Sequence, residues 1–418
     1  MPQEKPRLQP REGVRRLADP ILALAEIEGA GAILLVLATA VALIWANLPF
    51  GESYQAFWHL PLGLTVGSFD FRLSLEQWVN DALMAVFFLA VGLEIKREMV
   101  LGELSKLRRA MLPLAGAFGG MVVPAGIYVW YHLGGEASRG WGIPMATDIA
   151  FAVAALAALG RRVPASLKIF LLALAIVDDI GAVLVIALFY TDHISLEFLA
   201  ICGAFLGLVV VLQRVGVRAF LPYWIVGAGV WFFMHESGVH ATIAGVLLGL
   251  MTPVQAPGKG ALGTSEIGVE IDSPLDVLLH RLERLVTFGI MPVFALANAG
   301  VVLDGAMLAN PLAQQVGIAV ALGLVLGKPI GITFFAWLAV RLRIAEVPSG
   351  LGMASILGVG ALGGIGFTMA LFVTALAFDA PIPTAGAKVG ILVGSLLSFA
   401  LGVAVLHLRL PREPAPEA

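Results

Sequence analysis

Long apolar runs alternate with short polar connections along the chain. An apolar run of about 20 residues can form a helix that crosses the hydrocarbon core of a bilayer. The pattern therefore predicts an all-α membrane protein with about twelve transmembrane helices. The predicted segments are 21–47, 78–99, 110–132, 143–160, 167–190, 195–213, 219–236, 239–254, 277–302, 315–340, 352–378 and 385–407.

The composition agrees with this pattern. Apolar residues make up 59% of the 418 residues and charged residues 13%, whereas a soluble domain has about 25% charged residues. Mean hydropathy is +0.93, so membrane lipid is the expected surrounding of most of the chain. The net charge of −3 gives no reason to expect a nucleic-acid partner. The single cysteine, Cys202, excludes an intrachain disulfide.

Basic residues predict the orientation of the chain, because cytoplasmic loops carry an excess of Lys and Arg. Basic and nearly neutral connections alternate, with Arg72 and Arg139 as the exceptions. We therefore expect an even number of spans and both termini in the cytoplasm, as tails at 1–20 and 409–418. No signal-peptide cleavage site follows the basic N-terminal tail. The basic positions are Lys5, Arg7, Arg11, Arg15, Arg16, Lys96, Arg97, Lys106, Arg108, Arg109, Arg161, Arg162, Lys168, Arg214, Arg218, Lys259, Arg281, Arg284, Arg341, Arg343, Arg409 and Arg412.

Two connections differ from the others. Residues 59–73 alternate apolar and polar around Gly67 and Ser68, which predicts a hairpin outside the membrane. This hairpin is either a plain loop or a contact between two copies of the chain. Residues 255–272 are rich in glycine and predict a flexible cytoplasmic linker between two halves.

The apolar run 167–190 contains two adjacent carboxylates, Asp178 and Asp179. A charge inside the bilayer is costly, so these residues indicate function unless they serve a structural ion pair or hydrogen bond. Neighbouring residues on a helix point about 100° apart, so the two carboxylates face different surroundings. We therefore expect them to have different roles.

The run 143–160 contains a predicted interruption beside an acidic residue. Gly142 and Pro144 precede Thr147 and Asp148, and a proline removes a backbone hydrogen bond. Backbone groups freed at membrane depth need partners, and a cation and a carboxylate are suitable ones. The alternative is that Asp148 is a plain helix cap.

The run 352–378 contains a comparable interruption at Gly363, Gly364 and Gly366, followed by Thr368. Interrupted segments at corresponding places in two halves indicate a transport site between inverted-topology repeats. The fourth and eleventh segments correspond in this way. Close packing of small residues is the alternative explanation for the glycines.

Lys328 lies inside the apolar run 315–340, next to Pro329. A lysine at membrane depth needs a counter-charge or must lose its proton, and the aspartates of the fifth segment are the expected partners. Such a pair can be structural, functional or both.

Other motifs support no metal or nucleotide site. The histidines of HESGVH at 235–240 are five apart where a zinc helix needs four, and GLVLGK lacks both the P-loop spacing and the following Ser or Thr. Glu94 and Arg97 close the second segment, either as snorkelling charges or as an acid and base cluster that responds to pH. His240 is either an interfacial or a functional histidine.

The chain resembles the NhaA-type sodium/proton antiporters, in order and spacing, from about residue 21 to residue 408. The resemblance implies one unit over 21–408, with core spans within 110–190 and 315–407 and an interface domain from the remaining spans. It also implies that broken spans 4 and 11 cross each other. The stretches that carry it are ATDIAFA, LKIFLLALAIVDDIGAVLVIALFY, SGVHATIAGV, FALANAGV, GKPIGI and GGIGFTMALF.

The resemblance assigns roles by position. Asp179 corresponds to the carboxylate that binds Na+ or Li+, and Asp178 to the partner that exchanges protons and pairs with Lys328. Thr147 belongs to the unwound fourth span, where Asp148 offsets helix ends that face one another. Asp179, Asp178 and Thr147 are thus the candidate ligands of the cation.

The resemblance also points to positions associated with pH response, which are Glu94, Arg97 and His240 in this chain. The chain departs from the family pattern after Glu283, where Arg284 and Leu285 replace a His-Pro-Trp stretch. No role in pH response is carried over to that stretch.

The implied function is electrogenic exchange of cytoplasmic Na+ or Li+ for external H+, with two H+ per Na+ and pH-dependent activity, for sodium and pH homeostasis. The implied location is the bacterial inner membrane, and the implied assembly is a homodimer through 59–73. No cofactor and no enzymatic chemistry are implied, since a carboxylate pair that holds either protons or a cation is sufficient for antiport. The alternatives are a sodium-coupled symporter, which needs a polar, aromatic-lined cavity, and a proton channel, which needs a polar stripe along several spans.

Overall fold

The structure of the protein is a computed structural model that describes residues 29–67, 69–191, 193–217, 219–254, 273–305, 309–348 and 351–410. The predicted N-terminal tail 1–20, the linker 255–272 and the C-terminal tail beyond residue 410 lie outside the described residues. Ser68, one of the two residues of the predicted hairpin turn, lies outside them too.

The first half of the chain forms helices at the first six predicted segments, of which residues 21–28 lie outside the described residues. The rod Leu75–Val100 joins α4, η1 and α5, and a 3-10 helix, η3, precedes the short helix α7. The elements are α2 (Ala30–Asn47), α3 (Glu52–Trp58), α4 (Leu75–Gln77), η1 (Trp78–Leu83), α5 (Met84–Val100), η2 (Glu103–Ser105), α6 (Leu107–Tyr131), η3 (Glu136–Met145), α7 (Ile149–Ala157), η4 (Gly160–Arg162), α8 (Ala165–Phe189) and α9 (Leu196–Val215).

The second half is helical in the same way. Two of its rods contain a π-helical turn, η5 or η6, which is a feature often found at functional sites. The elements are α10 (Phe220–Glu236), α11 (Thr242–Met251), α12 (Pro274–Leu285), η5 (Val286–Ile290), α13 (Met291–Asn298), α15 (Pro311–Leu322), η6 (Gly323–Gly327), α16 (Lys328–Arg341), α17 (Met353–Gly363), α18 (Phe367–Ala377) and α19 (Pro381–Arg409).

Among the described residues, eight helices are long and apolar enough to cross a membrane, and α17 with α18 makes a ninth if the bent pair is one span. Large apolar side chains on these helices face outward, as do Leu188 and Leu408, which are 72% and 79% exposed. Such a surface is stable only against lipid or another apolar partner. The predicted all-α membrane fold is therefore confirmed, while α10, α11 and the rod from α12 to α13 do not meet the same criteria of length and apolar character.

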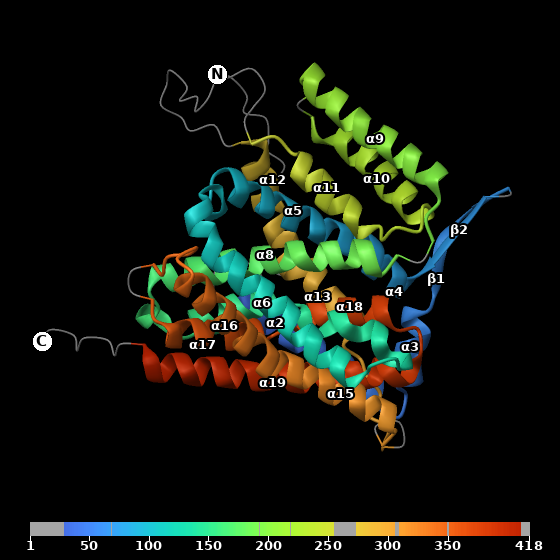
Figure 1. Ribbon diagram of the computed structural model, residues 1–418. Helices are drawn as coiled ribbons and strands as arrows, with labels where there is room; N and C mark the ends of the chain where they lie inside the picture. Colours follow the sequence, from blue (N-terminus) through green and yellow to red (C-terminus); the bar gives the residue numbers. More distant parts are fainter. Residues whose placement is uncertain are drawn as a thin grey trace, which may run out of the picture.

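Figure 1 shows a two-stranded antiparallel hairpin, β1 (Pro61–Val66) and β2 (Phe69–Ser74), projecting from one end of the helices. The prediction of a hairpin at 59–73 is correct. Gly67 has φ of +62°, a left-handed conformation that favours glycine in the turn. The C-terminal end of α19 lies at the opposite end of the molecule (Figure 1).

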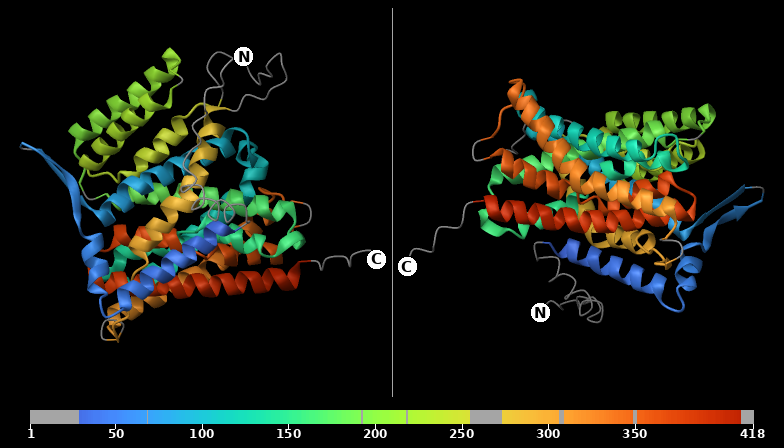
Figure 2. Two further views of the ribbon diagram at one scale, coloured as in Figure 1. Left: turned by 180° about the vertical axis from the view of Figure 1, so that it is seen from behind. Right: turned by 60° about the horizontal axis from the view of Figure 1, so that its bottom comes forward.

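The most extensive helix contacts fall into two groups, one made by α6, α15, α16, α17 and α19 and the other by α5, α9, α10 and α11. α6 packs extensively on α16, while α19 covers α15 and α17. Gly119 and Gly331 face each other between α6 and α16, and a methyl group on either would collide with the other's backbone, so glycine permits the close approach. In the second group, α11 packs along α5. α9 pairs with α10, and α9 and α10 lie at one edge of the molecule (Figure 2).

Regular helix stops in the fourth and eleventh predicted segments. The 3-10 helix η3 ends at Met145, and Ala146 and Asp148 have extended backbone before α7 begins. α17 ends at Gly363, and α18 begins at Phe367 with a bend of 49° between them. Both interruptions lie where the sequence predicts them.

Candidate functional site

The two interruptions bind each other. The Asp148 backbone N–H donates to the Ile365 carbonyl oxygen at 2.6 Å, and the Thr147 hydroxyl donates to the Gly363 carbonyl oxygen at 2.8 Å. These bonds satisfy backbone groups that the missing helical turns leave free, which is necessary where water is excluded. Residues more than 200 positions apart thus form one buried junction.

Asp148 connects the beginnings of two helices at this junction. Its Oδ1 accepts from the Phe151 N–H at 3.2 Å, which makes it the N-cap of α7. Its Oδ2 accepts from the Thr368 N–H at 3.1 Å in the first turn of α18 and also from the Thr368 hydroxyl. Two helix N-termini stabilise one carboxylate here, so Asp148 is a cap and a link between the broken segments.

Lys328 is fully buried, with 0% of its surface exposed. Its Nζ donates to Asp178 Oδ2 at 2.7 Å and to the Thr147 hydroxyl at 2.8 Å. The expected pairing of this lysine with the fifth segment is observed, and Asp178 is the partner. Because Thr147 then donates to Gly363, the ion pair is tied to the junction of the two interruptions.

The two adjacent carboxylates on α8 have different surroundings, as their rotation about the helix requires. Asp178 uses Oδ2 for Lys328, while its buried Oδ1 has no hydrogen-bond partner among the described residues. Asp179 is 2% exposed and makes no hydrogen bond or ion pair within the described part of the chain. A buried carboxylate without a partner is costly, and a bound proton or cation removes that cost.

α8 places the carboxylate pair among the interrupted helices. It packs against α6, α7, α17 and η3, and also against α5. The carboxylates lie near the middle of its 25 residues and are therefore distant from both ends of the helix, where it can meet water. Five of the predicted site residues, Thr147, Asp148, Asp178, Asp179 and Lys328, thus occupy one buried region.

The three residues matched to pH response lie elsewhere. Arg97 Nε is 3.5 Å from Asp276 Oδ1, an ion pair between α5 and α12. Glu94 lies one turn before Arg97 on α5, and its charged neighbours are Glu283, Glu98 and Arg97. His240, by contrast, donates from Nε2 to the Tyr190 carbonyl oxygen at 2.8 Å. The structure does not bring these three residues together into one cluster.

Thr368 is a site residue whose contact the sequence did not predict. It was visible only as the threonine after the predicted glycine interruption, and its partner, Asp148, comes from another segment. The tyrosines that hold η3 were also missed. Tyr128 donates to the Ala137 carbonyl oxygen at 2.9 Å, and Tyr190 donates to that of Arg139 at 2.7 Å. The glycines of η3 were the one signal available in the sequence.

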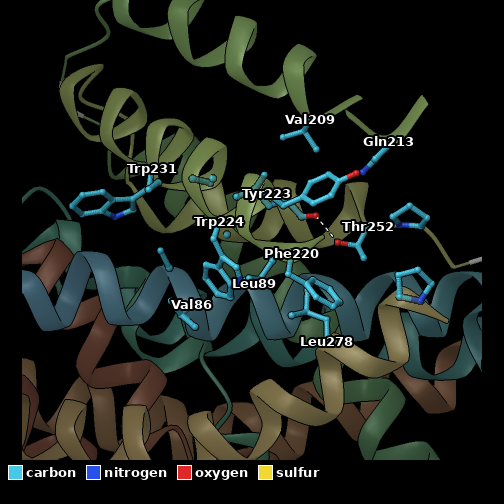
Figure 3. A pocket seen from close by; sticks show the side chains of 18 of the residues that line it. Val86, Leu89, Val209, Gln213, Phe220, Tyr223, Trp224, Trp231, Thr252 and Leu278 are labelled. Carbon is cyan, nitrogen blue, oxygen red and sulfur yellow. Dashed lines mark hydrogen bonds between the residues drawn. The ribbon is translucent and has the colours of Figure 1, made fainter. Parts of the chain in front are cut away.

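A large cavity lies away from this charged site. Its volume is about 840 Å3, and it lies among α5, α9, α10, α11 and α12, with aromatic side chains such as Phe220, Trp224 and Trp231 on its walls (Figure 3). None of the five buried site residues lines it. The chemistry therefore points to the junction of the interruptions, and cavity size does not.

The chain is similar to known proteins over most of its length. The family model described as "Na+/H+ antiporter 1" matches residues 23–406. A protein named Na+/H+ antiporter NhaA from Rhodopirellula baltica is 46% identical over 432 residues, covering 96% of this chain and 97% of the relative. Antiporters of the same name from Vibrio campbellii and an Acidovorax species are 46% and 47% identical, covering 96% and 95% of this chain and 98% and 96% of the relatives.

Proposed function

Because the chain belongs to the Na+/H+ antiporter 1 family, we propose that it exchanges cytoplasmic Na+ or Li+ for external H+ at the carboxylate pair of α8. It is an integral, multi-pass membrane protein and a transporter of Na+ and H+, not an enzyme. The observation that carries the choice of site is Asp179, a buried carboxylate without a partner among the described residues, next to the pair of Asp178 and Lys328.

The mechanism is competition for one site. Asp179 binds Na+ only when it is deprotonated, and protonation discharges the cation. Thr147 offers a hydroxyl oxygen that is bound to Lys328 and Gly363, and Lys328 also binds Asp178, whose Oδ1 has no hydrogen-bond partner among the described residues. Small hard cations such as Na+ and Li+ prefer oxygen ligands of this kind, as Ca2+ and Mg2+ do.

The ion pair with Lys328 gives Asp178 a role different from that of Asp179. While the ion pair of 2.7 Å is intact, Asp178 is held as a carboxylate against the ammonium. A cation at Asp179 brings positive charge toward Lys328, and a proton on Asp178 breaks the ion pair, so occupancy of one carboxylate changes the other. Asp148 remains bound to its two helix N-termini and keeps the junction in place.

Two carboxylates support a ratio of two H+ to one Na+. If both are protonated on the external side and both are deprotonated when Na+ leaves the cytoplasm, two charges enter for each one expelled. The exchange is then electrogenic and responds to the membrane potential. This stoichiometry supports expulsion of sodium at the expense of the proton gradient.

In transport by alternating access, the ion site opens first to one side of the membrane and then to the other. The following arrangement of the spans would allow this. We place the chain in the bacterial inner membrane with twelve crossings, both termini in the cytoplasm, and broken spans 4 and 11 crossing at the junction of Asp148. Core spans within 110–190 and 315–407 then move against an interface domain that includes α5 and α9 to α13. The separate packing of α6 with α16 and of α5 with α11 supports this division of the unit 21–408.

The hairpin supports a homodimer. A two-stranded sheet leaves both outer edges unpaired, and β1 also exposes Leu62 and Leu64 at 55% and 72%. Such edges and apolar side chains are stabilised by a second copy of the same hairpin. The hairpin would then lie on the external side of the membrane.

Regulation by pH is assigned to Glu94, Arg97 and His240. Arg97 pairs with Asp276, which joins α5 to α12 within the proposed interface domain, whereas His240 reaches Tyr190 at the end of α8 and so connects that domain to the core spans. A change in the charge of Glu94, beside Arg97, or of His240 alters a contact between helices, which is a common basis of pH-dependent activity.

The test is sodium-dependent proton transport in proteoliposomes with an imposed pH gradient, from pH 6 to about pH 9. We expect the native protein to release protons when Na+ is added and Asp179→Asn to show no exchange while remaining folded. A matched control is Asp304→Asn, which changes an exposed aspartate outside the site. Retained exchange in Asp179→Asn would move the cation site to Asp178 or Asp148, and exchange that requires an organic solute would favour a symporter.

A further inference from the structure

Tyr190 stands at the end of α8 and connects three elements. Its hydroxyl donates to the Arg139 carbonyl oxygen at 2.7 Å and accepts from the Gly142 N–H at 3.2 Å, both on η3. Its own carbonyl oxygen accepts from His240 Nε2 at 2.8 Å, just before α11. The residue is 3% exposed, so these hydrogen bonds do not compete with water.

η3 needs support from outside. A 3-10 helix of ten residues is long for its type, and its internal hydrogen bonds have poorer geometry than those of an α-helix. Two tyrosines supply the support, because Tyr128 on α6 donates to the Ala137 carbonyl oxygen at 2.9 Å. Gly142 leaves room for the second one: a methyl group there would lie 2.7 Å from the Tyr190 hydroxyl oxygen.

η3 leads directly into the site. It ends at Met145, two residues before Thr147, which binds Lys328 and the Gly363 carbonyl oxygen. Tyr190 is on the helix that carries the carboxylate pair, eleven residues after Asp179, or about 16 Å along the axis at 1.5 Å per residue. The Tyr190 hydroxyl therefore fixes the distance between the helix of the carboxylates and the segment of Thr147 and Asp148.

We propose that Tyr190 is a positioning residue for cation binding: its hydroxyl holds η3 against the end of α8 and so keeps Thr147 opposite the carboxylate pair. This inference rests on the proposed function. It assigns to Tyr190 no contact with the ion, and it makes the hydroxyl, rather than the ring, the important group.

The contribution of Tyr190 does not itself depend on pH. The residue lies just beyond the span Ala165–Phe189, and burial raises the pKa of its hydroxyl to about 12, although the Gly142 N–H lowers it. The hydroxyl therefore remains a hydrogen-bond donor throughout the range in which carboxylates and histidines titrate. Loss of the hydroxyl should change the binding of Na+ equally at every pH tested.

The test compares Tyr190→Phe with the native protein in proteoliposomes, measuring the KM for Na+ and the maximal rate at several pH values. Loss of two hydrogen bonds to a buried backbone should raise the KM for Na+ about tenfold, with the maximal rate and the shape of the pH profile retained. Tyr128→Phe, which loses one bond further from Thr147, should raise the KM less.

Tyr223→Phe is the matched control. Its hydroxyl, on α10, donates at 2.9 Å to the carbonyl oxygen of Val217 in the connection between α9 and α10, away from η3. The control should keep the native KM for Na+ even if it loses thermal stability, because a merely structural hydroxyl does not act on the ion site.

Two results would overturn the inference. One is a native KM in folded Tyr190→Phe, and the other is an equal rise in KM for Tyr190→Phe and Tyr223→Phe. Asp179→Asn in the same assay separates this failure from failure of the proposed site. If Asp179→Asn abolishes exchange while Tyr190→Phe is native, only the positioning role is wrong; if Asp179→Asn is active, the site itself is wrong.

Discussion

Replacing Lys328 by an apolar residue should lower the free energy of unfolding, because Asp178 then remains buried without its ion-pair partner. In Lys328→Met the side chain keeps its approximate length, but Asp178 loses the donor at 2.7 Å and Thr147 loses the donor at 2.8 Å. Both groups are buried, so water cannot replace the lysine. Breaking a buried ion pair from one side costs about 3–5 kcal/mol, because an uncompensated charge remains.

The second substitution isolates that cost. Asp178→Asn removes the charge that Lys328→Met leaves behind, so the double variant should be more stable than the sum of the two single effects by about 3 kcal/mol.

The assay is denaturant unfolding in detergent, followed by tryptophan fluorescence, for the native protein, both single variants and the double variant. Lys388→Met is the matched control, because this lysine lies on α19, donates to the Gly300 carbonyl oxygen at 3.4 Å and, among the described residues, has Glu76 as an acidic neighbour without an ion pair. Its loss breaks no ion pair among the described residues and should cost about 1 kcal/mol or less. Additive effects of Lys328→Met and Asp178→Asn would refute the reasoning.

Three further predictions use other contacts. In proteoliposome exchange, Thr368→Val should raise the KM for Na+ about tenfold, because Asp148 loses a hydroxyl donor. Thr368→Ser keeps that hydroxyl, and Thr374→Val removes only a bond within α18, so both should have a KM near the native value. Gly119→Ala should lower the free energy of unfolding in denaturant by about 1–3 kcal/mol, because its methyl group meets the Gly331 backbone. Gly126→Ala, on the same helix, places its methyl group in open space and should leave that free energy unchanged. Arg97→Gln should move the pH profile of exchange to higher pH, because the Glu94 carboxylate loses the positive charge beside it. Arg108→Gln, which breaks an exposed pair, should leave the profile unchanged.

Each of these predictions can fail separately. A native KM in Thr368→Val would mean that the backbone N–H alone fixes Asp148. Equal stability of Gly119→Ala and Gly126→Ala would mean that α6 and α16 can separate without cost. An unchanged pH profile in Arg97→Gln would remove the Glu94 cluster from the account of regulation.

The helical fold and the five buried site residues could be predicted because their signals are local. Apolar length predicts helices, the order of Gly142 and Pro144 predicts the first interruption, and a charge in an apolar run marks a site wherever it occurs. The different surroundings of Asp178 and Asp179 followed from the rotation of a helix alone.

The contacts could not be predicted in the same way, because they join residues far apart in sequence. The run 167–190 alone does not show that Asp178 rather than Asp179 faces Lys328, and only the family resemblance implied this pairing. Nothing near Thr368 shows that Asp148 lies opposite. Tyr190 looked like one more aromatic residue at the end of an apolar run, and its role depends on how η3 folds back against α8. The cavity of about 840 Å3 was likewise invisible, since five helices form it.

The most direct test of competition at the carboxylate pair is the number of protons released when Na+ binds to the purified protein in unbuffered detergent solution. The account predicts that Na+ releases protons from the native protein, approaching two per Na+ at a pH where both carboxylates are protonated, and none from Asp179→Asn. Binding of Na+ without proton release, or equal release from Asp179→Asn, would contradict it.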